Sequence, residues 1–174
     1  MPESTELAFR HTLQHRTDVL ELDIQMTAGD DNEEEQFVVW HGPGLDNVRL
    51  AFDEEGTRSR RKITQYKWSE LDQQAWVADP GTPKEKLGEV PQNSDRLLLT
   101  LERFLQLFPI ERLNIELKWS VKRRHLPRLI EILEAHNPKR VGLVASNLNE
   151  CLIQSFQRQT KGRFAINTPF LRSV

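Results

Sequence analysis

The sequence predicts an α/β fold in which a parallel sheet is connected by helices. Three observations lead to this prediction. After Thr100, apolar spacings typical of helices alternate with short apolar strands. Two segments, 20–24 and 113–118, alternate strictly between apolar and polar residues, as strands do. Between them, the stretch from Gly42 to about Asp95 has no clear period and carries most of the glycines and prolines.

The first elements are a helix and a hairpin. A helix is expected from Ser4 to about His15, since proline and hydroxyl residues before it are start signals. A strand at 19–24 and a second at 37–41 flank an acidic, glycine-containing turn at 29–35. The segment from Gly42 onward is long, polar and irregular, and we expect an insertion or lid there.

The second half of the chain alternates regularly. Leu101, Phe104, Leu105 and Phe108 have helical spacing, and Pro109 ends that helix. The remaining expected elements are a strand at 113–118, a helix around 126–133, a strand at 141–145, a helix at 148–160 and a strand at 164–166. Such alternation is typical of parallel strands joined by helical crossovers.

Composition excludes several classes of protein. Lys and Arg number 24 against 26 Asp and Glu, which gives a net charge of −2 and argues against a nucleic-acid binder that works by bulk charge. No apolar run approaches the ~20 residues of a membrane-spanning helix. The single cysteine, Cys151, excludes an internal disulfide framework, and its helical position predicts a small core residue. The first residues show no secretory signal, so a cytoplasmic location is expected.

Two predicted strands carry polar residues on one face. Glu21 and Asp23 alternate with leucines in the first, and Asn114, Glu116 and Lys118 alternate with apolar residues in the second. Strands of a parallel sheet are usually apolar on both faces, because both faces are covered. Buried carboxylates are costly unless they are paired or bind a metal ion, so these positions indicate a site. Half-exposed strands would give the same alternation, and that alternative stays open.

A histidine is expected beside these carboxylates. If the segment from Glu21 to His41 is a hairpin that turns about Asn32, antiparallel pairing places His41 opposite Asp23. A shift of one residue would turn the imidazole to the other face of the sheet.

Four motifs occur in an order that resembles a known family. They are the segments 2–9, 20–27 (LELDIQMT), 38–41 (VVWH) and 113–118 (LNIELK). Together they resemble the glycerophosphodiester phosphodiesterase family, whose fold is a (β/α)8 barrel with an insertion after the second strand. The resemblance implies one partial domain over residues 1–174. This domain is a partial TIM barrel of about strands two to five of eight, with a hairpin arm and an insertion at about 42–98.

The resemblance also implies roles for particular residues. Glu21, Asp23 and Glu116 match the metal-binding carboxylates, His41 matches one of two catalytic histidines, and Lys118 matches a residue that contacts the phosphate. Carboxylate oxygens suit Mg²⁺ or Ca²⁺. The cation and Lys118 would offset charge on the phosphoryl group, and His41 would move a proton.

The implied activity is the metal-dependent hydrolysis of glycerophosphodiesters to glycerol 3-phosphate and an alcohol, in lipid metabolism. The implied partner is a small glycerophosphodiester or lysophospholipid. The family's His-Arg-Gly motif, which supplies the other histidine, would precede Pro2, and the chain also stops before the last barrel strands. We therefore expect a truncated domain of impaired activity, whose unpaired sheet edges would allow an oligomer. Two alternatives are a non-catalytic remnant that acts as a binding module and a lysophospholipase D-like activity.

Overall fold

The computed structural model describes residues 2–42, 44–45, 48–50, 61–77, 94–145 and 150–166. These residues form a six-stranded sheet in the order β5-β2-β1-β6-β7-β8, and β3 pairs separately with β4. The strands are β1 (Leu20–Met26), β2 (Phe37–Val39), β3 (Val48–Leu50), β4 (Ala75–Val77), β5 (Leu99–Thr100), β6 (Leu113–Leu117), β7 (Val141–Ala145) and β8 (Ala165–Ile166). The helices are α1 (Glu6–Gln14), α2 (Trp68–Leu71), α3 (Leu101–Leu107), α4 (Leu126–Glu134) and α5 (Glu150–Thr160).

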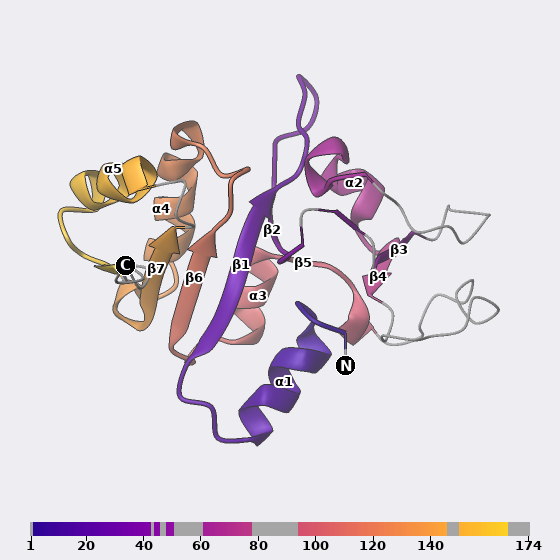
Figure 1. Ribbon diagram of the computed structural model, residues 1–174, viewed down its shortest axis with the longest axis horizontal. Coiled ribbons are helices and arrows are strands. Elements are labelled where there is room, and N and C mark those ends of the chain that lie inside the picture. The colour runs from indigo at the N-terminus through magenta and orange to yellow at the C-terminus, as the bar shows by residue number, and fades with distance from the viewer. Residues whose placement is uncertain are drawn as a thin grey trace, which may run out of the picture.

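The prediction of an α/β fold with parallel strands is confirmed. Strands β1, β6, β7 and β8 pair in parallel, in that order, and helices α4 and α5 connect the last three of them. Strand β2 is antiparallel to β1, and β5 is antiparallel to β2. Within the described residues the sheet is open, with β5 and β8 at its edges (Figure 1).

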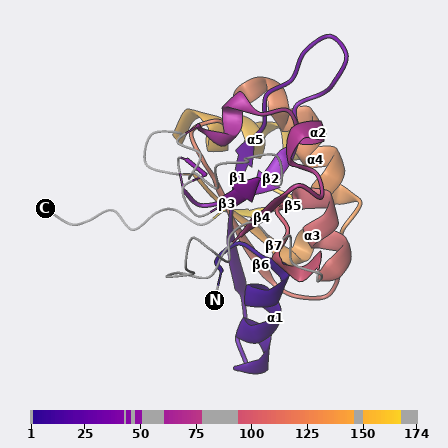
Figure 2. The ribbon, with the colours of Figure 1, turned by 90° about the vertical axis from the view of Figure 1, so that its right-hand side faces the viewer.

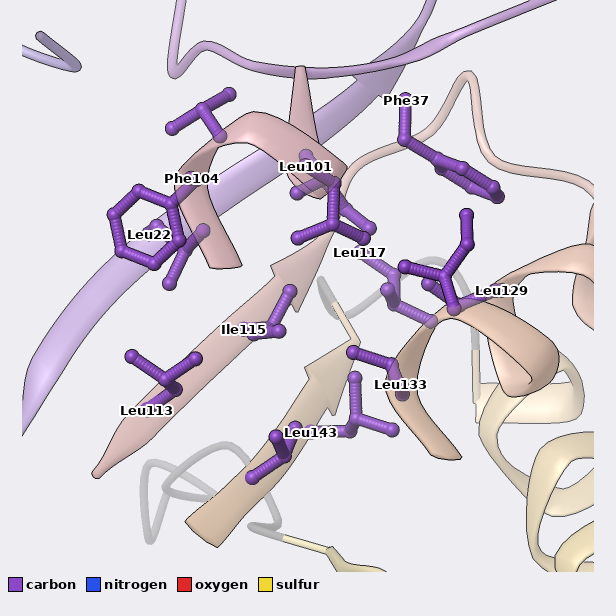
Figure 3. Close-up of a cluster of buried hydrophobic side chains, with 14 of the residues drawn as sticks. Leu22, Phe37, Leu101, Phe104, Leu113, Ile115, Leu117, Leu129, Leu133 and Leu143 are labelled. Carbon is purple, nitrogen blue, oxygen red and sulfur yellow. The ribbon is translucent and has the colours of Figure 1, made fainter. Parts of the chain in front are cut away.

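The main core lies between one face of the sheet and the helices. Leu22, Ile115 and Leu143 from three neighbouring strands are fully or almost fully buried there. They meet apolar side chains of α3 and α4 such as Phe104 and Leu133 (Figure 3). Because successive strand residues point to opposite faces, the polar residues that alternate with these leucines and isoleucines face away from the helices.

The helices begin where the sequence provides caps. The hydroxyl of Thr5 accepts a hydrogen bond from the backbone N–H of Ala8 at 3.3 Å, and the hydroxyl of Thr100 accepts one from that of Arg103 at 3.1 Å. These bonds satisfy N–H groups that a helix leaves free in its first turn. Helix α4 has Pro127 in its first turn, where proline is compatible with a helix.

A second apolar cluster covers the other face of β2. Val38 and Trp40 point into it, and Leu45, Ile63 and Leu71 from the following segment complete its centre. The expected insertion at 42–98 is described only in part, and the described part contains α2, the β3–β4 pair and this buried cluster. The described part of this segment therefore packs on the face of β2 that lies opposite the main core.

The β1–β2 hairpin is confirmed, but its predicted register is wrong by one residue. Ile24 pairs with Val39, and the backbone N–H of Trp40 donates to the carbonyl of Asp23 at 3.0 Å. Trp40, not His41, therefore lies opposite Asp23. The hairpin closes where the N–H of Thr27 bonds the carbonyl of Gln36 at 3.0 Å, which centres the loop between residues 31 and 32 rather than on Asn32.

The hairpin loop projects beyond the sheet (Figures 1 and 2). One of its residues, Glu35, makes ion pairs with the segment before α4. The carboxylate of Glu35 lies 2.7 Å from Nη2 of Arg124 and 2.9 Å from Nε2 of His125. His125 is almost fully buried, and its Nδ1 accepts a hydrogen bond from the backbone N–H of Lys122 at 2.8 Å. This arrangement requires a neutral imidazole that carries its proton on Nε2.

The hairpin contact gives a prediction of pH dependence. Burial lowers the pKa of His125, with Arg124 and Lys122 acting in the same direction and Glu35 opposing them. Because the pKa in the folded state lies below the unfolded value of about 6.5, this histidine contributes stability that is lost as pH falls below that value. Between about pH 7.5 and about pH 5.5, the free energy of unfolding of His125→Gln should therefore fall less than that of the parent chain.

Urea unfolding at the two pH values measures this difference. His11→Gln is the matched control, because His11 is exposed on α1, and it should follow the parent chain. An equal loss of stability in the parent chain and His125→Gln would contradict the prediction.

Candidate functional site

Three carboxylates converge on the polar face of the sheet. Glu21 and Asp23 come from β1, and Glu116 comes from β6, where it lies opposite Asp23 in the parallel register. One oxygen from each side chain lies within 4.8 Å of the oxygens of the other two. Asp23 is only 7% exposed, Glu116 is partly buried, and Glu21 is the most exposed of the three. The structure thus brings together the three residues that the sequence analysis assigned to metal binding.

Lys118 lies between two of these carboxylates. Its Nζ is 2.7 Å from Oδ1 of Asp23 and 2.9 Å from Oε1 of Glu116. The lysine follows the last residue of β6, and its backbone N–H donates to the carbonyl of Ile24 at 3.1 Å. Strand alternation therefore brings the ammonium group to the same face as the carboxylates.

The electrostatics of the cluster show an excess of negative charge. Burial raises the pKa of Glu21, and repulsion by Asp23 and Glu116 raises it further, while Lys118 and His41 act in the opposite direction. Burial opposes the charged form of Lys118, but its hydrogen bonds to Asp23 and Glu116 raise its pKa above the usual value. One lysine faces three carboxylates, so a further positive charge would be electrostatically favourable in the cluster.

The donor set fits a hard divalent cation. Oxygens that bind one Ca²⁺ at about 2.3–2.6 Å can lie up to roughly 5 Å apart, and the three carboxylates meet this limit. A bound cation would also relieve the repulsion that disfavours the ionised form of Glu21. The three carboxylates can therefore hold a metal ion.

His41 lies near the cluster without lying opposite Asp23. Its side chain is exposed, and its imidazole is close enough to Glu21 to lower the pKa of that carboxyl group. The chain leaves β2 at Val39, before His41, so strand alternation does not determine where the imidazole points. Although the register differs by one residue from the predicted one, His41 still lies near Glu21.

Two further residues shape the site and were not identified from the sequence. Gln25 is 1% exposed, and its Nε2 donates to the carbonyls of Trp40 at 3.1 Å and Gly42 at 2.6 Å. These bonds hold the segment that carries His41. Ser120 accepts a hydrogen bond from the N–H of Met26 at 3.0 Å and joins the ends of β1 and β6. Gln25 follows Glu21 and Asp23 at the same spacing of two residues, so strand periodicity could have placed it on the polar face.

Fold and site together define an α/β protein with a carboxylate and lysine centre on its parallel strands. Among solved structures, its fold is similar to that of a phosphodiesterase from Oleispira antarctica in complex with the product sn-glycerol-3-phosphate. The TM-score is 0.64 at 20% sequence identity, and the similarity covers 96% of this chain and 59% of that one. The chain thus spans about three fifths of that phosphodiesterase. Neither the family models nor the curated proteins give a match.

The described helices were compared with the length and hydropathy of a membrane-spanning helix. None of them combines the length and the apolar character that crossing a bilayer requires.

Proposed function

We propose that this chain is a metal-dependent phosphodiesterase domain that hydrolyses glycerophosphodiesters to glycerol 3-phosphate and an alcohol. The observation that carries the proposal is the convergence of Glu21, Asp23 and Glu116 around Lys118 on parallel strands. A fold similar to that of a phosphodiesterase with bound sn-glycerol-3-phosphate supports it. The strands β1, β6, β7 and β8 would correspond to about strands two to five of a (β/α)8 barrel.

Each residue has a role in this proposal. Glu21, Asp23 and Glu116 would hold Mg²⁺ or Ca²⁺, and the cation would supply positive charge that offsets the negative charge of the phosphoryl group. Lys118 lies beside the carboxylates and would bind a phosphate oxygen through its ammonium group. His41, held by the Gln25 contacts to its chain segment, would transfer a proton during cleavage of the ester bond.

Release of glycerol 3-phosphate from glycerophosphocholine tests the activity. We expect release with Mg²⁺ or Ca²⁺, loss of release in EDTA, and loss in Glu116→Gln. Glu131→Gln is the matched control, since Glu131 is exposed on α4 and should keep the activity. A folded chain that binds metal but releases no product under any condition would overturn the proposed activity and favour a binding module.

Metal binding also predicts a change in thermal stability. A cation at 100 times its dissociation constant should add about 2.7 kcal/mol to the free energy of unfolding, which raises the melting temperature by roughly 5–10 °C. Glu21→Gln should lose this increase. It should nevertheless melt higher than the parent chain in EDTA, because it removes a carboxylate whose pKa is raised by burial and by repulsion from its neighbours.

Scanning calorimetry with and without metal measures both effects. Equal melting temperatures of the parent chain in Mg²⁺, Ca²⁺ and EDTA would exclude the metal site. Glu131→Gln should keep the increase and again serves as the control.

A further inference from the structure

A cavity of about 370 Å³ lies between the loop that follows β6 and helix α5. Val121 and Leu152, which are almost fully buried, contribute its apolar lining, while Lys122, Arg123 and Arg158 contribute three cationic side chains. Cys151 also lines it and is exposed, contrary to the expectation of a core residue. The volume is typical of pockets that bind small organic ligands.

The three cations are held by uncharged partners. Lys122 donates to the carbonyl of Trp119 at 2.6 Å, Arg123 to the hydroxyl of Ser155 at 3.0 Å, and Arg158 to the carbonyl of Gln154 at 3.3 Å. These bonds fix the side chains but leave their charges in place.

Arg124, which lies outside the cavity lining, has a charged partner. Arg124 follows Arg123 directly and makes an ion pair with Glu35 at 2.7 Å. By contrast, no carboxylate of the described residues makes an ion pair with any of the three cavity cations. Within that part of the chain, the three cavity cations therefore have no carboxylate in ion-pair contact.

The helix adds to this field. Helix α5 begins at Glu150, so Cys151 and Leu152 lie in its first turn, where the backbone dipoles carry a partial positive charge. Three exposed cations and the first turn of α5 thus line one hollow of ligand size, and both kinds of positive charge favour a bound anion.

The cavity lies at the same end of the sheet as the carboxylate cluster but shares no residue with it. Trp119 connects the two regions, because it follows Lys118 and its ring centre is 5.9 Å from Nζ of Lys122. The lining includes residues of α5 and none of β1.

We propose that this cavity is a second anion-binding site, which takes the phosphate group of a small phosphate ester. Guanidinium groups bind phosphate oxygens through paired N–H donors, and a lysine adds a point charge. The phosphate could come from a soluble monoester or from the head group of a phospholipid, and both present the same chemistry to Arg123 and Arg158. The proposal goes beyond the proposed hydrolysis and does not depend on it.

Cys151 provides a direct test, because it is the single cysteine of the chain and lines the cavity. The rate of its alkylation by iodoacetamide is measured in EDTA at constant ionic strength. Saturating glycerol 3-phosphate or inorganic phosphate should slow alkylation at least about fivefold, and uncharged glycerol should not. Vesicles of phosphatidylcholine with phosphatidic acid, compared with phosphatidylcholine alone, test the lipid source.

Substitutions test whether the protection of Cys151 depends on the cations of the cavity. The double variant Lys122→Gln/Arg123→Gln should lose the protection, whereas Arg124→Gln, an adjacent arginine outside the cavity lining, should keep it. Glu116→Gln should also keep it, so failure of the proposed hydrolysis would leave this result unchanged. Absence of protection by all soluble phosphates and by acidic vesicles, or equal loss in Arg124→Gln, would overturn the proposal.

Discussion

His41→Gln is expected to lower the rate of glycerol 3-phosphate release by about 10²–10⁴-fold, the usual contribution of one general acid–base group. His41 is exposed, and the hydrogen bonds that position its segment reach backbone carbonyls rather than the imidazole. Glutamine should therefore preserve the local structure while removing a group that can gain and lose a proton near neutral pH. The measurement is product release from glycerophosphocholine at saturating Mg²⁺.

Two controls separate a chemical effect from a structural one. The melting temperature of His41→Gln should equal that of the parent chain, since an exposed side chain without core contacts contributes little to stability. His15→Gln changes an exposed histidine beyond the end of α1 and should keep the full rate. Equal rates for His41→Gln and the parent chain would remove His41 from the proton transfer.

Phe104→Ala is expected to lower the free energy of unfolding by about 3–5 kcal/mol. Phe104 is fully buried in the helix-facing core (Figure 3). The centre of its ring lies 4.8 Å from that of Phe9 and 4.9 Å from that of Phe108. Truncation removes apolar area and two aromatic contacts and leaves a cavity that rigid strands and helices cannot fill.

Urea unfolding of Phe104→Ala and the parent chain measures this loss. Ile110→Ala is the matched control, because Ile110 is 84% exposed and its truncation should change the free energy of unfolding by less than about 0.5 kcal/mol. Similar stabilities of Phe104→Ala and Ile110→Ala would show that this core does not hold the fold together.

Much of the candidate site was predictable because strand periodicity is local. Leu20, Leu22 and Ile24 had to face a core, so Glu21 and Asp23 had to share the opposite face. The same rule placed Glu116 and Lys118 together. Parallel pairing of β1 with β6 was the one non-local step, and helix-linked alternation after Thr100 indicated it.

The irregular segment after Gly42 was not predictable in the same way. Leu45, Ile63 and Leu71 are separated by polar residues without a period, so nothing local shows that they share a core with Val38 and Trp40. Their burial depends on how the described part of the segment packs on β2, which is a tertiary contact.

The sequence by itself determined the α/β fold, the start of α1, and the single polar face that carries the carboxylates. Only the tertiary structure decided the hairpin register, because a one-residue change depends on how the loop between Thr27 and Gln36 closes. It also decided the cavity beside α5, where Arg123 and Arg158 are distant in sequence and meet through packing. Periodicity acts over a few neighbouring residues, whereas register and cavities depend on contacts between distant ones.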